Sequence, residues 1–172
     1  MKNSENMYRT FENDLTIINR KAASSPVEFI HETEREYRKS LVEAARFLEQ
    51  RTDSIRIVMM AGPSSSGKTT TAKVLMGILR EMGIHSIDVS LDDFYKTREN
   101  SPTLSDGRPD FESPDALDIP QIGRCLMDLI EHHRGDLPIF DFSTHRPSVK
   151  RRHIELPEHS VVIVEGLHAL NP

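Results

Sequence analysis

One short stretch, residues 61–70, constrains the fold of this chain more than any other. It reads Ala-Gly-Pro-Ser-Ser-Ser-Gly-Lys-Thr-Thr and satisfies every fixed position of the phosphate-binding pattern G-x-x-x-x-G-K-[ST]. The two glycines allow backbone conformations closed to other residues, so consecutive N–H groups can turn inward and bind an anion. The residues predicted to bind the phosphates of a nucleotide are Gly62, Ser64, Ser65, Ser66, Gly67, Lys68, Thr69 and Thr70.

Two side chains of this stretch supply chemistry that backbone amides cannot. Lys68 can place a positive charge against the β- and γ-phosphates, and the hydroxyl of Thr69 can bind the Mg²⁺ that accompanies them. The loop also opens a predicted helix, whose positive dipole end attracts anions. We therefore predict a site for a nucleotide with Mg²⁺.

The flanking sequence agrees with this interpretation. Residues 55–61 form a nearly continuous apolar run, which is typical of a buried parallel strand. After the loop, apolar residues recur at helical spacing, and Gly83 stands where a helix C-cap belongs. Strand, loop and helix follow in the order that the pattern requires. This order argues against the alternative, a Gly/Ser-rich linker that happens to contain a lysine.

Length and composition predict a single soluble domain. A chain of 172 residues is long enough for one substantial core, and 37% hydrophobic with 28% charged residues is ordinary for a globular protein. The first residues carry no apolar segment and no run approaches a membrane span, so we expect a cytoplasmic protein without a membrane partner. The net charge of −5 argues against a general nucleic-acid binder.

Cysteine and histidine indicate no further metal or redox site. Cys125 is the single cysteine, so it cannot form an internal disulfide, and we expect it to be a small buried or half-buried residue. The eight histidines show no paired ligand spacing with one another or with Cys125, so we do not expect zinc.

The first fifty residues contain one clear helix. Residues 1–24 are polar with scattered apolar positions, and we treat them as an N-terminal extension whose order stays open. Ser25, Pro26 and Glu28 form a helix start, and an apolar face continues to about Gln50. We expect a leading helix over 25–51 that packs on the domain 25–172; the alternative is a helix that binds a partner.

Two more predicted strands end in acidic residues. Ile87, Val89 and Leu91 alternate with polar residues and lead into Asp92 and Asp93, while residues 161–164 are a buried parallel strand. In a doubly wound sheet, ligands bind at the carboxyl ends of the strands. Asp92 or Asp93 could accept a proton from a hydroxyl or orient Mg²⁺, although such a pair is also common at turns. Glu165, which ends the third strand, is predicted to serve the metal.

The remaining segments are predicted with less detail. Residues 96–113 form a loop, Ser113-Pro114 opens a helix or helix pair that breaks near Pro120, and Gly135 ends it. Residues 137–142 read as a short strand, and residues 149–156 could pair back as a ribbon. The basic run 150–152 either faces a phosphate or, as we favour, protects a sheet edge.

Five motifs in order resemble the uridine kinase and phosphoribulokinase family of P-loop kinases. These motifs are residues 62–70, Ser90-Leu91-Asp92-Asp93-Phe94-Tyr95, Asp110-Phe111-Glu112-Ser113-Pro114-Asp115-Ala116, Pro138-Ile139-Phe140-Asp141-Phe142-Ser143-Thr144-His145 and Val164-Glu165-Gly166-Leu167. The resemblance is greatest to bacterial uridine kinase-like proteins. It implies an α/β P-loop NTPase fold with helices on both faces of a parallel sheet, and transfer of the γ-phosphate of ATP to the 5′-hydroxyl of a nucleoside such as uridine or cytidine.

The resemblance also implies roles for individual residues. Lys68 would contact the phosphates, Asp92 would be the catalytic base, and the metal would be held by Thr69, Glu165 and Asp92. The residues implied to bind the acceptor are Tyr95, Glu112, Phe140, Phe142 and His145.

The chain departs from the family pattern at several positions. Glu112 stands where pyrimidine nucleoside kinases have Asp, Phe140 where they have Tyr, and Pro147 where Arg is common. The family continues beyond Pro172 into further strands and an arginine-bearing lid helix, so we expect a fragment or a truncated form that stops after the third core strand.

Two other functions remain open at this point. One is a kinase of the same family that phosphorylates a phosphorylated sugar or pantothenate, for which Arg146, Lys150, Arg151 and Arg152 could supply charge. The other is a nucleotide-binding module without catalysis. The sequence also leaves open the acceptor, whether the chain is active alone, and whether it forms a homo-oligomer.

Overall fold

The computed structural model describes residues 14–171, which divide between Leu41 and Val42 into two compact units. Between residues 14 and 171, no helix combines the length and apolar character needed to cross a membrane. The first unit holds α1 (Leu15–Ser24) and the start of α2 (Pro26–Glu49). The carboxylate of Asp14 caps α1 by accepting from the backbone N–H of Thr16 at 2.8 Å. Part of the N-terminal extension is therefore helical, and residues 1–13 lie outside the described residues.

Helix α2 confirms the predicted leading helix to within two residues at its ends. The apolar face predicted for it is buried only in its last turns, at Ala45 and Leu48, while Ile30 is 58% exposed. The part of α2 that belongs to the second unit therefore contributes to a core, as a packing helix does.

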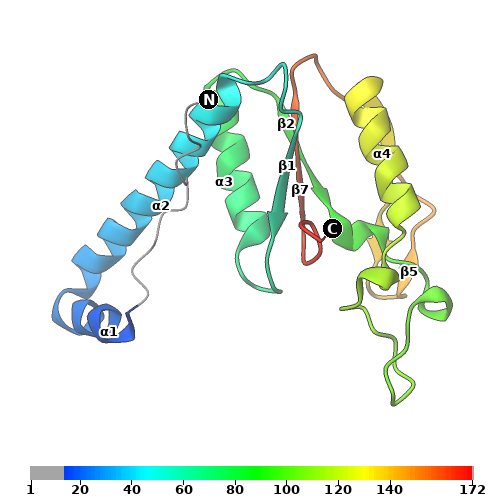
Figure 1. Ribbon diagram of the computed structural model, residues 1–172, viewed down its shortest axis with the longest axis horizontal. Coiled ribbons are helices and arrows are strands. Elements are labelled where there is room, and N and C mark those ends of the chain that lie inside the picture. Colours follow the sequence, from blue (N-terminus) through cyan, green and yellow to red (C-terminus); the bar gives the residue numbers. More distant parts are fainter. Residues whose placement is uncertain (1–13, 172) are drawn as a thin grey trace, which may run out of the picture. The chain divides into compact units, whose positions relative to one another are not determined.

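A three-stranded parallel sheet organises the second unit. Its strand order is β1 (Ile57–Ala61), β7 (Val161–Gly166) and β2 (Ser86–Ser90). Helix α3 (Lys68–Glu81) covers one face and α4 (Ile119–Glu131) the other, as Figure 1 shows. The predicted α/β fold with helices on both faces of a parallel sheet is confirmed.

The central strand β7 carries the core. Each of its residues from Val161 to Val164 is at most 1% exposed, because neighbouring strands and helices cover both of its faces. Val162 and Val164 pack in one cluster with residues of α4, including Leu126 and Leu129. Strand β1 was also predicted to be buried, but Met59 is 42% exposed. Within residues 14–171, β1 lies at an edge of the sheet and has a neighbour on one side only.

Two short antiparallel ribbons complete the second unit. In one, β3 (Arg134–Leu137) pairs with β6 (Arg152–Glu155); in the other, β4 (Phe140–Asp141) pairs with β5 (Arg146–Pro147). The strand predicted over residues 137–142 is therefore wrong as a single element. Gly135 lies inside β3 and does not end a helix, since α4 ends at Glu131.

Arg152 joins the first ribbon to the edge of the main sheet. Its guanidinium donates to the backbone carbonyl of Asp88 in β2 and lies 3.6 Å from the carboxylate of that residue. For Arg152, the edge-protecting alternative is therefore the one that the structure supports.

Three 3₁₀ segments connect these elements: η1 (Leu91–Phe94), η2 (Arg98–Asn100) and η3 (Pro114–Ala116). Leu91, predicted as the last residue of a strand, is the first of η1. Residues 96–113 otherwise form the predicted loop, with one isolated bridge between Thr103 and Pro109. The predicted helix pair is η3 followed by α4, whose second residue is Pro120.

Candidate active site

The loop between β1 and α3 has the backbone geometry of an anion nest. Ser65 and Gly67 both take positive φ angles, of 61° and 86°, which turn neighbouring N–H groups toward a common centre. A Cβ on Gly62 would lie 2.8 Å from the Oγ of Ser66, so any larger residue there would have to displace the Ser66 side chain. The Lys68 ammonium donates to the carbonyl of Pro63, at 2.9 Å, and so folds back over the loop.

Sheet register brings the loop and two acidic strand ends to one place. Ala61, the last residue of β1, pairs with Gly166 of β7, and Ser90, the last residue of β2, pairs with Glu165. The hydroxyl of Thr69 accordingly donates to the Oε1 of buried Glu165 at 3.4 Å. These two predicted metal-binding side chains are therefore in contact.

No group of three or more His, Cys, Asp or Glu side chains within residues 14–171 is arranged to hold a metal ion. This finding does not bear on the predicted Mg²⁺ site, because Mg²⁺ at such a loop takes a hydroxyl, phosphate oxygens and water alongside one or two carboxylates. Thr69 and Glu165, which are in contact, and nearby Asp92 are the side chains that could contribute to such a set.

Asp92 lies beside these groups, with part of its surface open to the cavity and to solvent. Burial is the largest cause that raises the pKa of its carboxyl, and the negative charge of Glu165 raises it further, while Lys68 opposes the shift. Burial and the neighbouring charges of Asp92 and Glu112 raise the pKa of Tyr95 to about 12, with a contribution from a hydrogen bond to Asp92. The Tyr95 hydroxyl therefore keeps its proton and is available as a hydrogen-bond donor beside Asp92.

The two adjacent aspartates have different surroundings. Asp92 lines a cavity, whereas the Oδ1 of Asp93 accepts the backbone N–H of Phe140 at 3.0 Å and so holds β4 against η1. The sequence left open which of the two faces the phosphates. This arrangement leaves Asp92 available for chemistry and gives Asp93 a structural role.

A cavity of about 290 Å³ extends from the loop to β4 and β5. It brings together Lys68 and Asp92 with every residue predicted to bind the acceptor. The full lining is Ser64, Lys68, Asp92, Tyr95, Phe111, Glu112, Phe140, Phe142, His145 and Leu167. The other predicted loop residues stand at the loop and the start of α3 and do not line this cavity.

Aromatic rings form much of the cavity wall. The ring of Tyr95 meets those of Phe111 and Phe140 edge-on at centroid distances of 5.5 and 5.7 Å. Phe140 meets Phe142 in the same way at 5.1 Å, and Phe111 stacks on His145 at 6.0 Å. Each ring is therefore oriented by another ring, which gives the wall a defined shape.

Two lining residues were missed by sequence reasoning. Phe111 stands between Asp110 and Glu112 in one of the motifs that resemble the family, and Leu167 directly follows Glu165-Gly166 in another. An apolar residue within two positions of a predicted site acid is the signal that could have found both. It is a weak signal, since an apolar residue beside a strand end is more often part of the core.

The fold and this loop define the class of protein: an α/β protein of the P-loop type, with the loop placed between the first strand and the helix that follows. Residues 57–171 match the model of the phosphoribulokinase / uridine kinase family. The chain belongs to that family.

Individual relatives agree with this assignment. The uridine kinase of Lactobacillus johnsonii is 31% identical over 114 residues, which cover 66% of this chain and 53% of that protein. The uridine kinase of Schizosaccharomyces pombe is 33% identical over 124 residues, or 67% of this chain and 25% of that protein. An Arabidopsis thaliana protein named inorganic pyrophosphatase TTM2 is 30% identical over 132 residues, which cover 77% of this chain and 18% of that protein.

Solved structures show the same fold. A possible uridine kinase from Bacillus stearothermophilus matches with a TM-score of 0.61 at 24% identity, over 78% of this chain and 71% of that one. D-glycerate 3-kinase from Cryptococcus neoformans matches with a TM-score of 0.54 at 22% identity, over 74% of this chain and 50% of that one. The chain spans about half the length of the Lactobacillus relative and smaller shares of the other two relatives named above.

Proposed function

We propose that this protein transfers the γ-phosphate of ATP to the 5′-hydroxyl of a nucleoside, with Mg²⁺ as cofactor. One observation carries the proposal: a single cavity joins the phosphate-loop lysine, Lys68, and the carboxylate of Asp92 to a wall of aromatic rings. Phosphoryl transfer needs a donor site, a proton acceptor and an acceptor pocket in contact with one another. Membership of a family that contains uridine kinases supports the same function.

The loop fits a nucleotide polyphosphate. The positive φ angles of Ser65 and Gly67 turn neighbouring N–H groups toward a common centre, and Gly62 adds no Cβ beside Ser66 and Lys68. The Lys68 ammonium bonds only a backbone carbonyl among the described residues, so it can exchange that carbonyl for a phosphate oxygen. Thr69 and Glu165 would hold Mg²⁺, which when bound neutralises the developing charge on the phosphates.

Asp92 is the proposed base. It lies on the cavity that would receive the acceptor, where it can take the proton of the attacking hydroxyl. Burial and the charge of Glu165 raise its pKa, which makes the ionised carboxylate a stronger proton acceptor. Tyr95 lines the same cavity as Asp92, and its hydroxyl can donate to that carboxylate and hold it in position.

The cavity suits a flat acceptor that carries hydroxyl groups. Aromatic faces of Phe111, Phe140 and His145 can contact a planar base, and the carboxylate of Glu112 can accept hydrogen bonds from ribose hydroxyls. None of the basic residues 146 and 150–152 lines the cavity. Arg146 instead pairs with Glu99 at 2.8 Å and Arg152 with Asp88. These pairings favour an acceptor without a phosphate over a phosphorylated sugar.

The test is a product assay with ATP, Mg²⁺ and a panel of uridine, cytidine, pantothenate and a phosphorylated sugar. Phosphate found on a pyrimidine nucleoside would support the proposal. Transfer only to another acceptor would contradict the proposed nucleoside specificity and leave the proposed kinase activity in place. ATP binding without transfer to any acceptor would favour a nucleotide-binding module that does not catalyse.

A further inference from the structure

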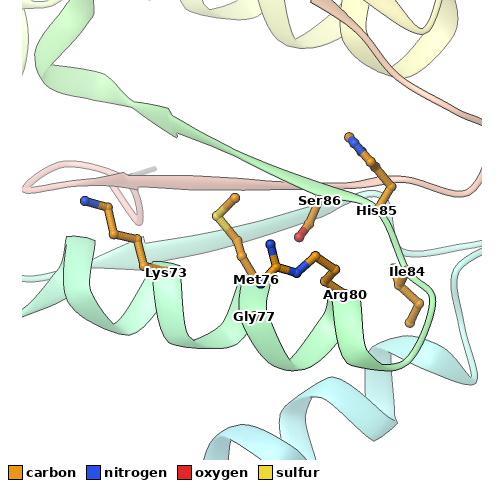
Figure 2. Close-up of a pocket in the computed structure, with 7 residues that line it drawn as sticks. All are labelled: Lys73, Met76, Gly77, Arg80, Ile84, His85 and Ser86. Carbon is orange, nitrogen blue, oxygen red and sulfur yellow. The ribbon is translucent and has the colours of Figure 1, made fainter.

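A second cavity lies beside α3, on residues that take no part in the first. It has a volume of about 350 Å³, compared with about 290 Å³ for the acceptor cavity. Its lining comes from residues 73–80 of α3, from the two residues before β2 and from the first residue of β2, as Figure 2 shows. The lining residues are Lys73, Met76, Gly77, Arg80, Ile84, His85 and Ser86.

The lining of this cavity is basic in a chain of net charge −5. Lys73 and Arg80 carry its positive charge, His85 stands at its rim, and no acidic residue of the described chain lines it. Within residues 14–171, the side chains of Lys73, Arg80 and Ser86 make no hydrogen bond or ion pair. Their donors are therefore available to a ligand, and the ligand that matches them is an anion.

Figure 2 shows which of these side chains point toward one another. The guanidinium of Arg80 folds back along α3 toward Gly77 and Met76, and the hydroxyl of Ser86 points toward the helix from β2. Lys73 lies about two turns before Arg80 on the same helix. His85 points away from α3, so it stands at the rim without facing the centre.

Gly77 keeps the centre of the cavity open. A Cβ built on it would have no heavy atom within 4 Å, so the space directly over Gly77 is empty of side chains. Half-buried Met76 and Ile84 add apolar surface next to that space. A charged end and an apolar part of a ligand could both be accommodated.

We propose that this cavity binds a small phosphate monoester with an apolar body, at a site separate from the nucleotide loop. The planar fork of Arg80 can bind two phosphate oxygens, and the hydroxyl of Ser86 can donate to a third. Lys73 adds a positive charge at the rim, since Figure 2 shows its ammonium directed away from Arg80 and Ser86, and Met76 and Ile84 contact the organic part. A volume of about 350 Å³ lies in the range of small-molecule sites.

The experiment is a titration of the ¹⁵N-labelled 172-residue chain, followed by amide chemical shifts, with phenyl phosphate and inorganic phosphate as the probes. The phosphate loop also binds phosphates, but its amides, residues 64–70, report separately from those of residues 77 and 84–86. We expect saturable shifts at the second set with about 10 mM of either probe or less. Because of Met76 and Ile84, phenyl phosphate should bind more tightly.

Three variants make the test specific. Arg80→Gln should weaken binding at residues 84–86 by at least about tenfold, since a charge-assisted pair is lost. Gly77→Leu should have a similar effect by filling the cavity, and its Cβ meets no neighbour that would disturb the helix. His85→Gln is the matched control and should leave affinity within about twofold, because its side chain points away.

Shifts at residues 64–70 should persist in all three variants, which checks that each one folds. The site is refuted if residues 77 and 84–86 do not respond in the wild-type chain, or respond equally in Arg80→Gln. Equal affinity for the two probes would refute the apolar part of the proposal.

Discussion

At the scale of single residues, Asp92 and Asp93 show how neighbours in sequence separate in role. Asp92 faces the acceptor cavity, while Asp93 binds the backbone N–H of Phe140. Sequence patterns place both at the carboxyl end of a strand but cannot distinguish them, because the difference depends on η1, which turns the two side chains in different directions. Substitutions at the two positions should therefore affect different kinetic constants.

Asp92→Asn should lower kcat by about 10²- to 10⁴-fold, because it removes the proposed base while keeping the size of the side chain. Binding of ATP should stay nearly unchanged, since the loop residues are intact. Single-turnover rates and an ATP titration would measure the two effects. Unchanged turnover would contradict the role of Asp92 as base.

Asp93→Ala should act mainly on the acceptor. Loss of the 3.0 Å bond to Phe140 frees β4, which carries part of the aromatic wall, so KM for the nucleoside should rise by about tenfold or more. Asp93→Asn should restore most of the affinity, because its amide oxygen can accept the same N–H. A fall in kcat alone, with KM unchanged, would argue against this positioning role.

At the scale of elements, the three parallel strands and the loop could be predicted because their signals are local. An apolar run or a glycine pattern within a few residues specifies each of them. The end of α4 could not be predicted in this way. His133 takes the positive φ angle of 56° there, a conformation for which sequence rules favour glycine, and Gly135 lies in β3 instead.

The break between β3 and β4 has a similar explanation. Residues 137–142 form one apolar run, but Leu137 pairs with Arg152, whereas Phe140 pairs with Pro147. Pro138 between them has no N–H to donate, so the ladder of β3 ends before it. An apolar run indicates a strand without indicating its partner, which is why the pattern alone suggested a single strand.

Gly166 holds the end of β7 close to η1. A Cβ there would lie 2.7 Å from the Cβ of Leu91, so Gly166→Ala should destabilise the fold by about 1–3 kcal/mol. Gly123→Ala is the control: it lies inside α4 with no heavy atom within 4 Å of its added Cβ, and it should stabilise by about 0.5–1 kcal/mol. Denaturant unfolding would measure both. Equal stability of the two variants would show that Leu91 can move aside.

The ribbon of β3 and β6 should depend on pH. The Nδ1 of His153 lies 2.8 Å from the Oδ1 of Asp136, and this hydrogen bond is the largest cause that raises the pKa of His153 above its ordinary value of 6.5. Because the pKa is raised in the folded state, the contribution to stability is complete below pH 6.5 and is lost as pH rises through the folded pKa.

An NMR titration of His153 would check this prediction in the wild type and in Asp136→Asn. The pKa should be above 6.5 in the wild type and should fall toward that value in the variant. As pH rises from 6.5 through the higher pKa of His153 in the folded protein, amide exchange in the ribbon should accelerate by more than its ordinary pH dependence. Identical His153 pKa values in both proteins would show that the contact with Asp136 does not form in solution.

At the scale of the whole molecule, the cavity was the part least accessible to sequence reasoning. Its walls come from the phosphate loop, η1, the loop over residues 96–113 and the β4–β5 ribbon, which no local pattern joins. The family resemblance did group five of these residues, the ones that it implied to bind the acceptor, and all five line the same cavity. It could not indicate that Arg146 and Arg152 form ion pairs outside the cavity. Their partners are Glu99 in the loop over residues 96–113 and Asp88 in the edge strand β2.

The second unit, Val42–Pro172, contains the loop, both acidic strand ends and the cavity, so nucleotide binding should stabilise it as a whole. A ligand at 100 times its Kd adds about 2.7 kcal/mol to the free energy of unfolding, which should raise Tm by about 5–10 °C. Differential scanning calorimetry with and without Mg²⁺–ATP would measure this shift. Lys68→Ala should lose most of it, because the ammonium no longer balances the phosphates, whereas His85→Gln should keep it. The same shift in Lys68→Ala as in the wild type would place the nucleotide somewhere other than this loop.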